Sequence, residues 1–478
     1  MKRIKSIMLI VFVLLTVIWG ISTNFEALTW SYFSIRGFAV QYSGIIAISV
    51  MSLLMILALR LSVVEKLTQG LDKSYRLHKW LGIASLIFII VHWFWAKVTK
   101  YMVGLGLLDK PARNAGQGSG FGQGSGGVGQ GGGGLGKGLE NATGNGFGGA
   151  GSNAPDSTTL EGFFGGFRHF AESIGEWGFY LLVALIAIAL IDTIRYSKFL
   201  NTHKIMSVVY LVFVFHAVIL MDFNYWFEPI GWLVGSLMTM GSLAAVYSLA
   251  GQIGKKNKVK GKVETFDFYA DNRVLDITIN TDKKWKGHHP GQFAFVQFPG
   301  EEAHPFTIAS VMNESGKIRF QIKGIGDFTN HLNDHLSIND EVSVEGPYGY
   351  FDFKSTTEHQ IWVAGGIGIA AFTAQMEHLA INPPSKQTDL FYCTQCPDTD
   401  FIDHIQHLAN QANINFHFVD TNIDGFLSAE KICQQVSGWE KADIWFCGPN
   451  GFAKSLQQRF ESLGLKESRF HCELFKMR

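Results

Sequence analysis

The sequence carries little charge and few cysteines. Charged residues make up 17% of its 478 positions, and 40 basic side chains balance 40 acidic ones. A net charge of zero, with no basic patch interleaved with aromatic residues, excludes bulk electrostatic binding of nucleic acid. All five cysteines fall in the last quarter of the chain, which argues against a disulfide framework. Cys393 and Cys396 form a CxxC within the apolar run LFYCTQC, a pattern more typical of strand packing than of a zinc or redox site.

Hydrophobic residues, at 47%, indicate a membrane protein with a soluble part. A bilayer-spanning helix needs about 20 apolar residues. Spans are predicted at 7–23, 38–60, 79–101, 174–195, 204–222 and 229–250. The first span follows the basic start MKRIK and has no clear small-residue cleavage site, so we expect it to stay uncleaved rather than act as a secretory signal. Clusters of basic residues then place both termini in the cytoplasm.

The membrane part is predicted to cover residues 1–254. Its third and fourth spans are joined by an outer segment, 104–171, whose stretch 115–151 is so rich in Gly that a solvated linker is expected. Arg168 and His169, just before the fourth span, either line an acceptor pocket or lie among lipid headgroups.

Four histidines lie inside two apolar stretches, His78 and His92 in one and His203 and His216 in the other. An ionisable ring inside a membrane segment is costly and marks a functional site by default. Along an α-helix 14 residues span about 21 Å and return to within about 40° of the same face, so the first pair points one way from two depths. If the second pair faces it, two stacked sites result that suit haem irons with two axial ligands each. The alternative is that each histidine is a satisfied core or interface residue.

The second pair fits this geometry less well. Thirteen residues leave about 140° of rotation between His203 and His216, so we expect a frayed helix start at His203 or an intervening bulge. The topology puts His78 and His203 near the cytoplasm and the other two near the outside.

Three small or aromatic residues lie between these histidines in the sequence. Gly82 and Ser85 would let a macrocycle approach the backbone, and Tyr210 could fill the gap between two haems.

After Gly254 the composition becomes that of a soluble protein. Residues 255–356 alternate polar and apolar in short runs separated by Gly, Asp and Asn turns, which predicts a small β-barrel or sandwich. Residues 357–478 alternate apolar strands with helices, which predicts a parallel sheet covered on both faces.

Three motifs in the soluble part carry candidate chemistry. HPFTIAS (304–310), preceded by PGQF (290–293), offers an aromatic flanked by hydroxyls at a strand end, which can stack on a flat ring. KGIGDFT (323–329) offers glycines, a helix start and a cation for a pyrophosphate. AGGIGI (364–369) is a strand entering a Gly turn before a helix, which suits a dinucleotide phosphate. Each alone is a weak signal, but the ordered set completed by CGP (447–449) is strong.

In their order these motifs resemble the flavin and nicotinamide modules of the ferredoxin–NADP reductase superfamily. Following six spans with paired histidines, they resemble the NADPH oxidase and ferric reductase family, particularly its bacterial members. The resemblance implies a multi-domain membrane protein: a six-helix transmembrane di-haem bundle, a β-barrel FAD domain and an α/β Rossmann-like NAD(P)-binding domain. It also implies a multi-pass protein of the bacterial inner membrane.

The resemblance carries specific residues with it. Two b-type haems would be bound by His78 with His203 and by His92 with His216. FAD would be held by His304, Pro305, Phe306, Thr307, Lys323, Gly326 and Thr329. NADPH or NADH would bind at Gly365, Gly366, Gly368, Gly448 and Pro449. Thr307, Cys447 and the C-terminal aromatic Phe475 would lie nearest the reacting rings, although three further residues follow Phe475.

The implied activity is an FAD- and haem-dependent NAD(P)H oxidoreductase that passes electrons across the membrane to a small-molecule acceptor, a ferric complex or dioxygen. No obligatory protein partner is expected. The first alternative is a cytochrome b-type reductase that feeds a quinone or a periplasmic partner protein. A second is a non-enzymatic haem sensor, against which the complete flavin and nicotinamide set argues.

Some positions depart from the family pattern. Animal oxidases carry a histidine, linked to oxygen reduction, one turn beyond the outer ligand. This chain has Trp95, Ala96 and Lys97 there, so ferric iron and oxygen are both open as the electron acceptor. CTQCPDTDF (393–401) lacks an Arg or Lys for a 2′-phosphate, so NADH is as plausible as NADPH. The stretch from Asp420 to Lys431 resembles half a calcium loop but lacks its final Glu, which favours a simple turn.

Overall fold

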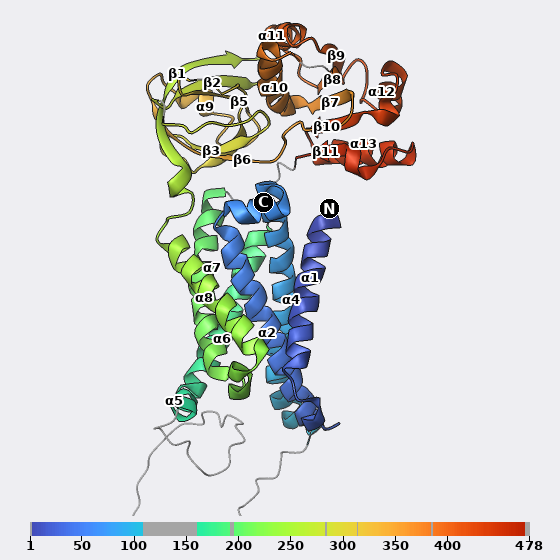
Figure 1. Ribbon diagram of the computed structural model, residues 1–478. Helices are drawn as coiled ribbons and strands as arrows, with labels where there is room; N and C mark the ends of the chain where they lie inside the picture. The colour runs from blue at the N-terminus through green and yellow to red at the C-terminus, as the bar shows by residue number, and fades with distance from the viewer. Residues whose placement is uncertain are drawn as a thin grey trace, which may run out of the picture.

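The computed structural model describes residues 2–108, 160–191, 196–282, 284–312, 314–383 and 386–473. A bundle of long helices forms its N-terminal half, and two sheet-containing domains lie together at one end of that bundle (Figure 1). The Gly-rich stretch 115–151 lies outside the described residues.

The bundle contains six helices long and apolar enough to cross a membrane, so the protein is a multi-pass membrane protein. They are α1 (Lys2–Ile21), α2 (Tyr32–Ala58), α4 (Leu71–Gly104), α6 (Arg168–Leu190), α7 (Tyr196–Leu220) and α8 (Pro229–Leu249). The shorter helices are α3 (Ser62–Thr68) and α5 (Leu160–Gly166). All six predicted spans are present, but α4 begins at Leu71, well before the predicted start at 79. The extra turns project beyond the apolar span, toward the sheet domains.

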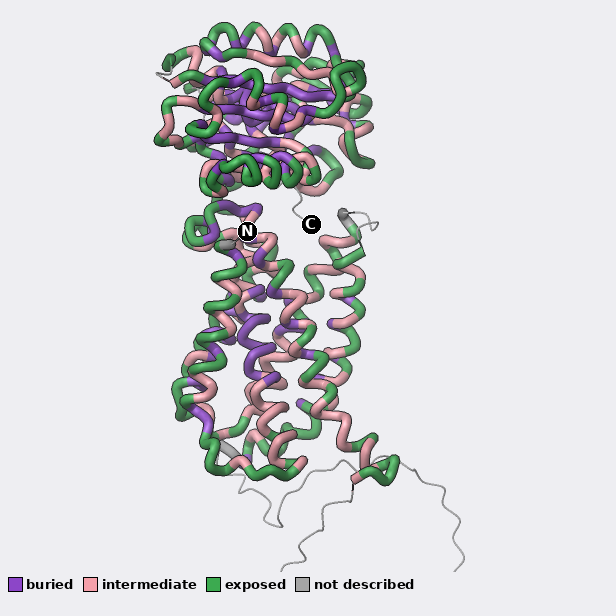
Figure 2. The backbone as a smooth tube through the Cα atoms, turned by 90° about the vertical axis from the view of Figure 1, so that its right-hand side faces the viewer, coloured by how far each residue is buried: buried purple, intermediate pink, exposed green. Residues whose placement is uncertain are grey.

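Helix α2 is the centre of the bundle. It lies against α4 and α8, while α6 lies against α7. Its buried face is continuous from Ser43 to Leu54, and Ser31 caps its start by accepting a hydrogen bond from the Ser34 N–H. Large apolar side chains such as Trp177 and Trp232 remain exposed on the outer faces of other helices, as expected where lipid replaces water. In Figure 2 the buried backbone is concentrated in the sheets and inside the bundle.

The first sheet domain is a closed antiparallel barrel. Its strands are β1 (Lys258–Tyr269), β2 (Val274–Asn280), β3 (Phe293–Gln297), β4 (His304–Thr307), β5 (Lys317–Lys323) and β6 (Glu341–Tyr348). They run in the order β4-β3-β6-β1-β2-β5, and a bridge between Ile308 and Phe320 joins the two edges. Alternating burial in β5 places Ile318, Phe320 and Ile322 in the barrel core.

The second sheet domain has a five-stranded parallel sheet in the order β11-β10-β7-β8-β9. Its elements are β7 (His359–Gly365), α10 (Ile369–Ile381), β8 (Gln387–Thr394), α11 (Thr399–Gln411), β9 (Asn415–Asp420), α12 (Ala429–Gln435), β10 (Asp443–Cys447), α13 (Asn450–Ser462) and β11 (Phe470–Cys472). Helix α9 (Leu332–His335) belongs to the barrel, and short 3-10 helices occur at Phe25–Ala27, Phe223–Phe227, Lys255–Asn257, Gly366–Gly368, Trp439–Lys441 and Glu467–Arg469.

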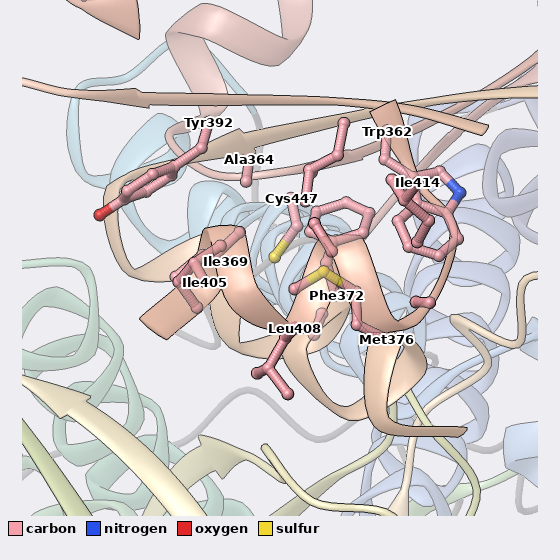
Figure 3. Close-up of a cluster of buried hydrophobic side chains, with 14 of the residues drawn as sticks. Trp362, Ala364, Ile369, Phe372, Met376, Tyr392, Ile405, Leu408, Ile414 and Cys447 are labelled. Atoms are coloured by element: carbon pink, nitrogen blue, oxygen red, sulfur yellow. The ribbon is translucent and has the colours of Figure 1, made fainter. Parts of the chain in front are cut away.

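Apolar side chains cover both faces of this parallel sheet, as predicted. On one face Trp362 of β7, Phe372 of α10 and Cys447 of β10 pack together (Figure 3). The other face packs residues such as Phe391 and Phe446 against α12 and α13. Two short strands were not predicted from the sequence: the segment HPFT is itself strand β4, and β11 adds a fifth parallel strand.

Candidate electron-transfer site

Four histidines meet in two pairs between α4 and α7. The ring centroids of His78 and His203 lie 6.0 Å apart, and those of His92 and His216 lie 6.2 Å apart. Imidazole nitrogens bind transition metals at about 2.0–2.1 Å, so two rings on one metal have centroids about 6 Å apart. The spacing within each pair therefore suits one iron with two axial histidines.

Hydrogen bonds orient three of these rings through the main chain. Nδ1 of His92 lies 3.0 Å from the carbonyl oxygen of Val40, and Nδ1 of His216 lies 2.8 Å from that of Ala171. His78 bonds to the backbone of Leu54. A ring whose Nδ1–H donates to a carbonyl leaves Nε2 as the free lone pair, which is the usual state of a metal ligand. Nδ1 of His203 is buried and has no hydrogen-bond partner among the described residues.

Glycines make room around the pairs. A Cβ built on Gly44 would lie 3.0 Å from Cε1 of His92, and one built on Gly175 would overlap Nδ1 of His216. By contrast, a Cβ on Gly82 would meet no atom within 4 Å. Helices α2 and α6 thus approach the rings closely, while open space borders α4 between its two histidines. Both features fit a flat macrocycle held between the rings.

The structure corrects the expectation for the second pair. Helix α7 is continuous from Tyr196 to Leu220, so His203 is not at a frayed start and no bulge intervenes. The His216 ring instead reaches toward α6, where Ala171 accepts its hydrogen bond. Tyr210, between the two, is fully buried and points to α2 and α8, with its hydroxyl 2.8 Å from that of Ser52.

The two motifs predicted for the flavin meet at one end of the barrel. The ring of His304 stacks on Phe328 at 5.0 Å, so strand β4 touches the KGIGDFT loop. Pro305, Phe306 and Thr307 continue β4, and Lys323 ends the neighbouring β5. In the loop, the Thr329 hydroxyl accepts hydrogen bonds from the N–H groups of Ile325 and Gly326. The helix expected at this motif is only the four-residue α9, which begins at Leu332, so Thr329 rather than a helix start organises the loop.

The nicotinamide motifs meet at the carboxyl ends of β7 and β10, which are neighbours in the sheet. A Cβ on Gly365 would press on Pro449 and one on Gly368 would overlap the Cys447 carbonyl, while Gly366 has a φ of +54°. A Cβ on Gly448 would likewise lie 3.0 Å from the backbone Cα and N atoms of Gly365. Only glycine permits this approach, which leaves a backbone-lined edge at the start of α10.

The three residues expected nearest the reacting rings are placed differently from one another. Thr307 is half-buried at the end of β4. The Cys447 side chain lies in the core beside Phe372, and burial raises the pKa of its thiol well above its usual value (Figure 3). Phe475 lies outside the described residues.

The bundle touches the barrel through the segment between α2 and α4. Arg60 pairs with Glu345 at 2.5 Å, and its guanidinium lies 4.0 Å above the ring of Phe295. Glu65 accepts a hydrogen bond of 2.9 Å from the Gly349 N–H. Leu71, the first residue of α4, packs with three barrel side chains: Phe293, Phe295 and Tyr348. His78 follows on the same helix at about 10 Å from Leu71, so the inner pair lies close to the barrel.

A third carboxylate joins this contact from the end of the chain. Glu473, directly after β11, is buried, and neither carboxylate oxygen has a partner among the described residues. A Cβ on Gly349 would lie 3.0 Å from its Oε1, so Glu473 and Glu65 meet at the same glycine. Burial, then the nearby Asp72, raises the pKa of Glu473 well above its ordinary value, and burial likewise raises the pKa of Glu65.

Comparisons with known proteins agree with this arrangement. A family described as "Ferric reductase like transmembrane component" matches residues 43–123, and one described as "FAD-binding domain" matches residues 259–352. The protein thus joins a segment similar to a ferric reductase transmembrane component to a segment similar to an FAD-binding domain. The first match contains α4 with His78 and His92, and the second contains both flavin motifs.

Curated relatives resemble the reductase part. The reductase component of propane 2-monooxygenase from Rhodococcus jostii (strain RHA1) is 26% identical over 204 residues, covering 39% of this chain and 55% of the relative. A flavohemoprotein of Vibrio cholerae serotype O1 is 22% identical over 202 residues, covering 39% and 51%. The chain therefore spans about half the length of these relatives.

Solved structures match the same part. The flavohem-like FAD/NAD binding domain of nitric oxide dioxygenase from Vibrio cholerae O1 biovar El Tor has a TM-score of 0.40 at 18% identity, covering 45% of this chain and 97% of that one. The cytochrome b5 reductase domain of Ulva prolifera nitrate reductase has a TM-score of 0.40 at 17% identity, covering 46% and 98%.

Sequence reasoning missed the residues that join the ferric-reductase-like component to the reductase. Arg60, Glu65, Glu345 and Glu473 belong to no motif, and their contacts link positions hundreds of residues apart. The one available signal was Arg60 in the group of basic residues on the cytoplasmic side, which was interpreted through the positive-inside rule alone.

Three other features that the sequence singled out have the following surroundings in the structure. The calcium-like stretch is a turn in which Lys431 donates to the Asp424 carbonyl at 2.6 Å, and the described residues contain no group of three or more His, Cys, Asp or Glu side chains that could hold a metal ion. Cys393 is buried and Cys396 is exposed, both as free thiols. Arg168 pairs with Glu172 at the exposed start of α6.

Proposed function

We propose that the protein carries electrons from cytoplasmic NAD(P)H through FAD and two b-type haems to an acceptor on the outer face of a bacterial inner membrane. The observation that carries this proposal is the stacking of two facing histidine pairs on α4 and α7, with a flavin-type barrel docked at the inner pair. The pairs lie about 21 Å apart along α4, which spans most of a hydrocarbon core of about 30 Å.

The chain's own residues would bind and orient the cofactors. His78 with His203 and His92 with His216 would each offer two imidazole nitrogens to one haem iron, and backbone carbonyls fix three of the rings. Strand β4 and the Thr329 loop form the flavin end of the barrel, and the Gly366 turn presents the nicotinamide edge. When bound, FAD would take up the two electrons of a hydride together and pass them singly to the haems.

The outer end favours electron transfer without proton chemistry. Lys97, one turn beyond the outer pair, is paired with Glu176 at 2.7 Å, and Arg36 donates to the carbonyls of Trp95 and Ala96. These side chains are occupied in holding helices together. This supports outer-sphere reduction of an acceptor such as a ferric complex, with dioxygen as the other acceptor to test.

The test is purified protein in proteoliposomes with NADH or NADPH outside, on the reductase side. Reduction of enclosed ferric citrate or oxygen, together with low-spin haem bands and bound flavin, is the expected result. Reduction of an added quinone but of neither enclosed acceptor would favour the cytochrome b-type alternative. Absence of haem bands or of flavin would overturn the proposal.

A further inference from the structure

A partly buried ion pair links the barrel to the parallel-sheet domain. Arg319 of β5 donates from Nη2 to Oε1 of Glu377 on α10 at 2.6 Å, and each side chain is only about one-fifth exposed. The pair is one of the polar contacts in an interface whose apolar part includes Val274 of the barrel and Phe372 of α10.

On the barrel side, this pair holds the residues that follow the flavin motif. The same Nη2 of Arg319 donates to the Ala309 carbonyl at 3.0 Å, and Oε2 of Glu377 accepts from the Val311 N–H at 2.9 Å. Ser310, the last residue of HPFTIAS, lies between them and accepts a hydrogen bond from the Arg319 N–H. Both members of the ion pair therefore bond to the backbone at the end of the HPFTIAS motif.

On the other side, the pair is built into the helix that starts at the nicotinamide turn. Helix α10 begins at Ile369, directly after the 3-10 turn Gly366–Gly368, and Glu377 lies about 12 Å further along its axis. One turn before Glu377, the buried Thr373 donates to Gln321 of β5 at 3.2 Å. The Gly366–Gly368 turn itself lies against β5. A shift of α10 on the barrel would thus move the turn.

We propose that Arg319 and Glu377 are positioning residues that set the nicotinamide turn against the flavin motif and so fix the geometry of hydride transfer. This inference rests on the proposed function, because it requires a hydride donor at the turn and a flavin at the motif. Rate is steeply sensitive to such placement, since a displacement of about 1 Å can cost about 100-fold. Arginine suits the role because Nη2 carries two N–H bonds in a rigid plane, one for the carbonyl and one for the carboxylate, whereas a lysine ammonium on its flexible stem does not fix these directions.

The variants to compare are Arg319→Met and Glu377→Gln, with Arg459→Met as the matched control. Arg459 pairs with Glu430 on the exposed surface of the parallel-sheet domain, away from the flavin and the nicotinamide motifs. We expect Arg319→Met to slow flavin reduction about tenfold or more and to raise its deuterium isotope effect, while the KM for the nicotinamide stays within about twofold. Hydrogen exchange at the Val311 amide should accelerate in Glu377→Gln, and Arg459→Met should match the wild type in every measurement.

Several outcomes would overturn the inference. Flavin reduction at the wild-type rate in both interface variants would do so even if their Tm fell, because the pair would then be merely structural. Should Arg319→Met not fold, Arg319→Lys keeps the charge, and an unchanged rate in it would count equally against the proposal. A wild-type protein that binds FAD yet accepts hydride from neither NADH nor NADPH would instead defeat the proposed function, and this inference with it.

Discussion

Glu65 of the membrane bundle accepts a hydrogen bond from the backbone N–H of Gly349 in the barrel, across a distance of 2.9 Å. The barrel residue follows β6, and the carboxylate belongs to α3, the short helix that precedes the histidine-bearing α4. This bond and the nearby Arg60–Glu345 pair hold the barrel against the bundle at the end nearer His78. Flavin-to-haem electron transfer would therefore depend on side chains that touch neither cofactor motif.

Replacing Arg60 tests that dependence. Arg60→Met leaves the largely buried Glu345 without its charge partner, so we expect a loss of about 3 kcal/mol in the free energy of unfolding. Flavin reduction by NAD(P)H should persist, while haem reduction slows at least tenfold. Stopped-flow absorbance at flavin and haem wavelengths separates the two steps. The double variant Arg60→Met with Glu345→Gln removes the unpaired charge and should regain much of the stability but not the haem reduction rate. Equal haem reduction in wild type and Arg60→Met would refute the docking role.

The outer histidine pair makes a separate prediction. His92→Leu removes one of the four proposed haem ligands, so the haem content should fall from about two to about one per chain. Flavin-dependent dye reduction on the reductase side should remain, whereas reduction of an impermeant outer acceptor should be lost. Pyridine haemochrome spectra give the content. His407→Leu, at an exposed position on α11, is the control and should change neither value. Unchanged transmembrane reduction in His92→Leu would contradict the assignment.

Gly175 tests how closely α6 must approach the outer pair. A side chain there would overlap His216, so Gly175→Val should displace the ring from the Ala171 carbonyl and cost the outer haem. The inner haem should remain, because its ligands lie about 20 Å away. Gly37→Ala on α2 is the control, since a Cβ there meets no atom within 4 Å. Visible spectra and haem counts of the two purified variants decide the matter, and two intact haems in Gly175→Val would show the contact to be unimportant.

The buried Glu473 predicts a pH dependence of stability. Burial raises its pKa in the folded protein, so the folded state holds this proton more tightly than the unfolded chain does. The stability contributed by the group is therefore complete below the ordinary Glu value of about 4.3 and is lost as pH rises through the folded-state pKa. Glu473→Gln should raise the Tm at alkaline pH and flatten the dependence. Thermal unfolding of detergent-solubilised protein from acidic to alkaline pH measures this, with the exposed Glu461→Gln as control. If the Tm of Glu473→Gln depended on pH in the same way as the Tm of the wild type, the folded protein would not hold Glu473 in its protonated form.

Local chemistry made much of the architecture predictable. Long apolar runs predict membrane helices because a segment in the bilayer must satisfy its backbone hydrogen bonds internally. Glycine turns at strand ends can be recognised from residue type alone. Short strands such as β4 and β11 escaped prediction because three or four residues carry no periodicity of their own, and their partners alone define them. The rotation expected between His203 and His216 likewise ignored how far a side chain can reach toward a neighbouring helix.

The contacts between domains could not be predicted for a different reason. Arg60 and Glu345, or Arg319 and Glu377, are unremarkable charged residues whose significance arises only when folding brings distant segments together. From the sequence alone, such charged residues are interpreted as solvent-exposed surface residues, and this interpretation is correct for most of them.

Helix α4 runs unbroken from its barrel contact at Leu71 through His78 and His92 to Gly104. One residue inserted between Leu71 and His78 would turn everything beyond it by about 100° and lift it by about 1.5 Å. Both imidazoles would then leave their partners on α7 at once. We therefore expect related chains to have the same number of residues between Leu71 and His78, so that they align through this part of the helix without gaps.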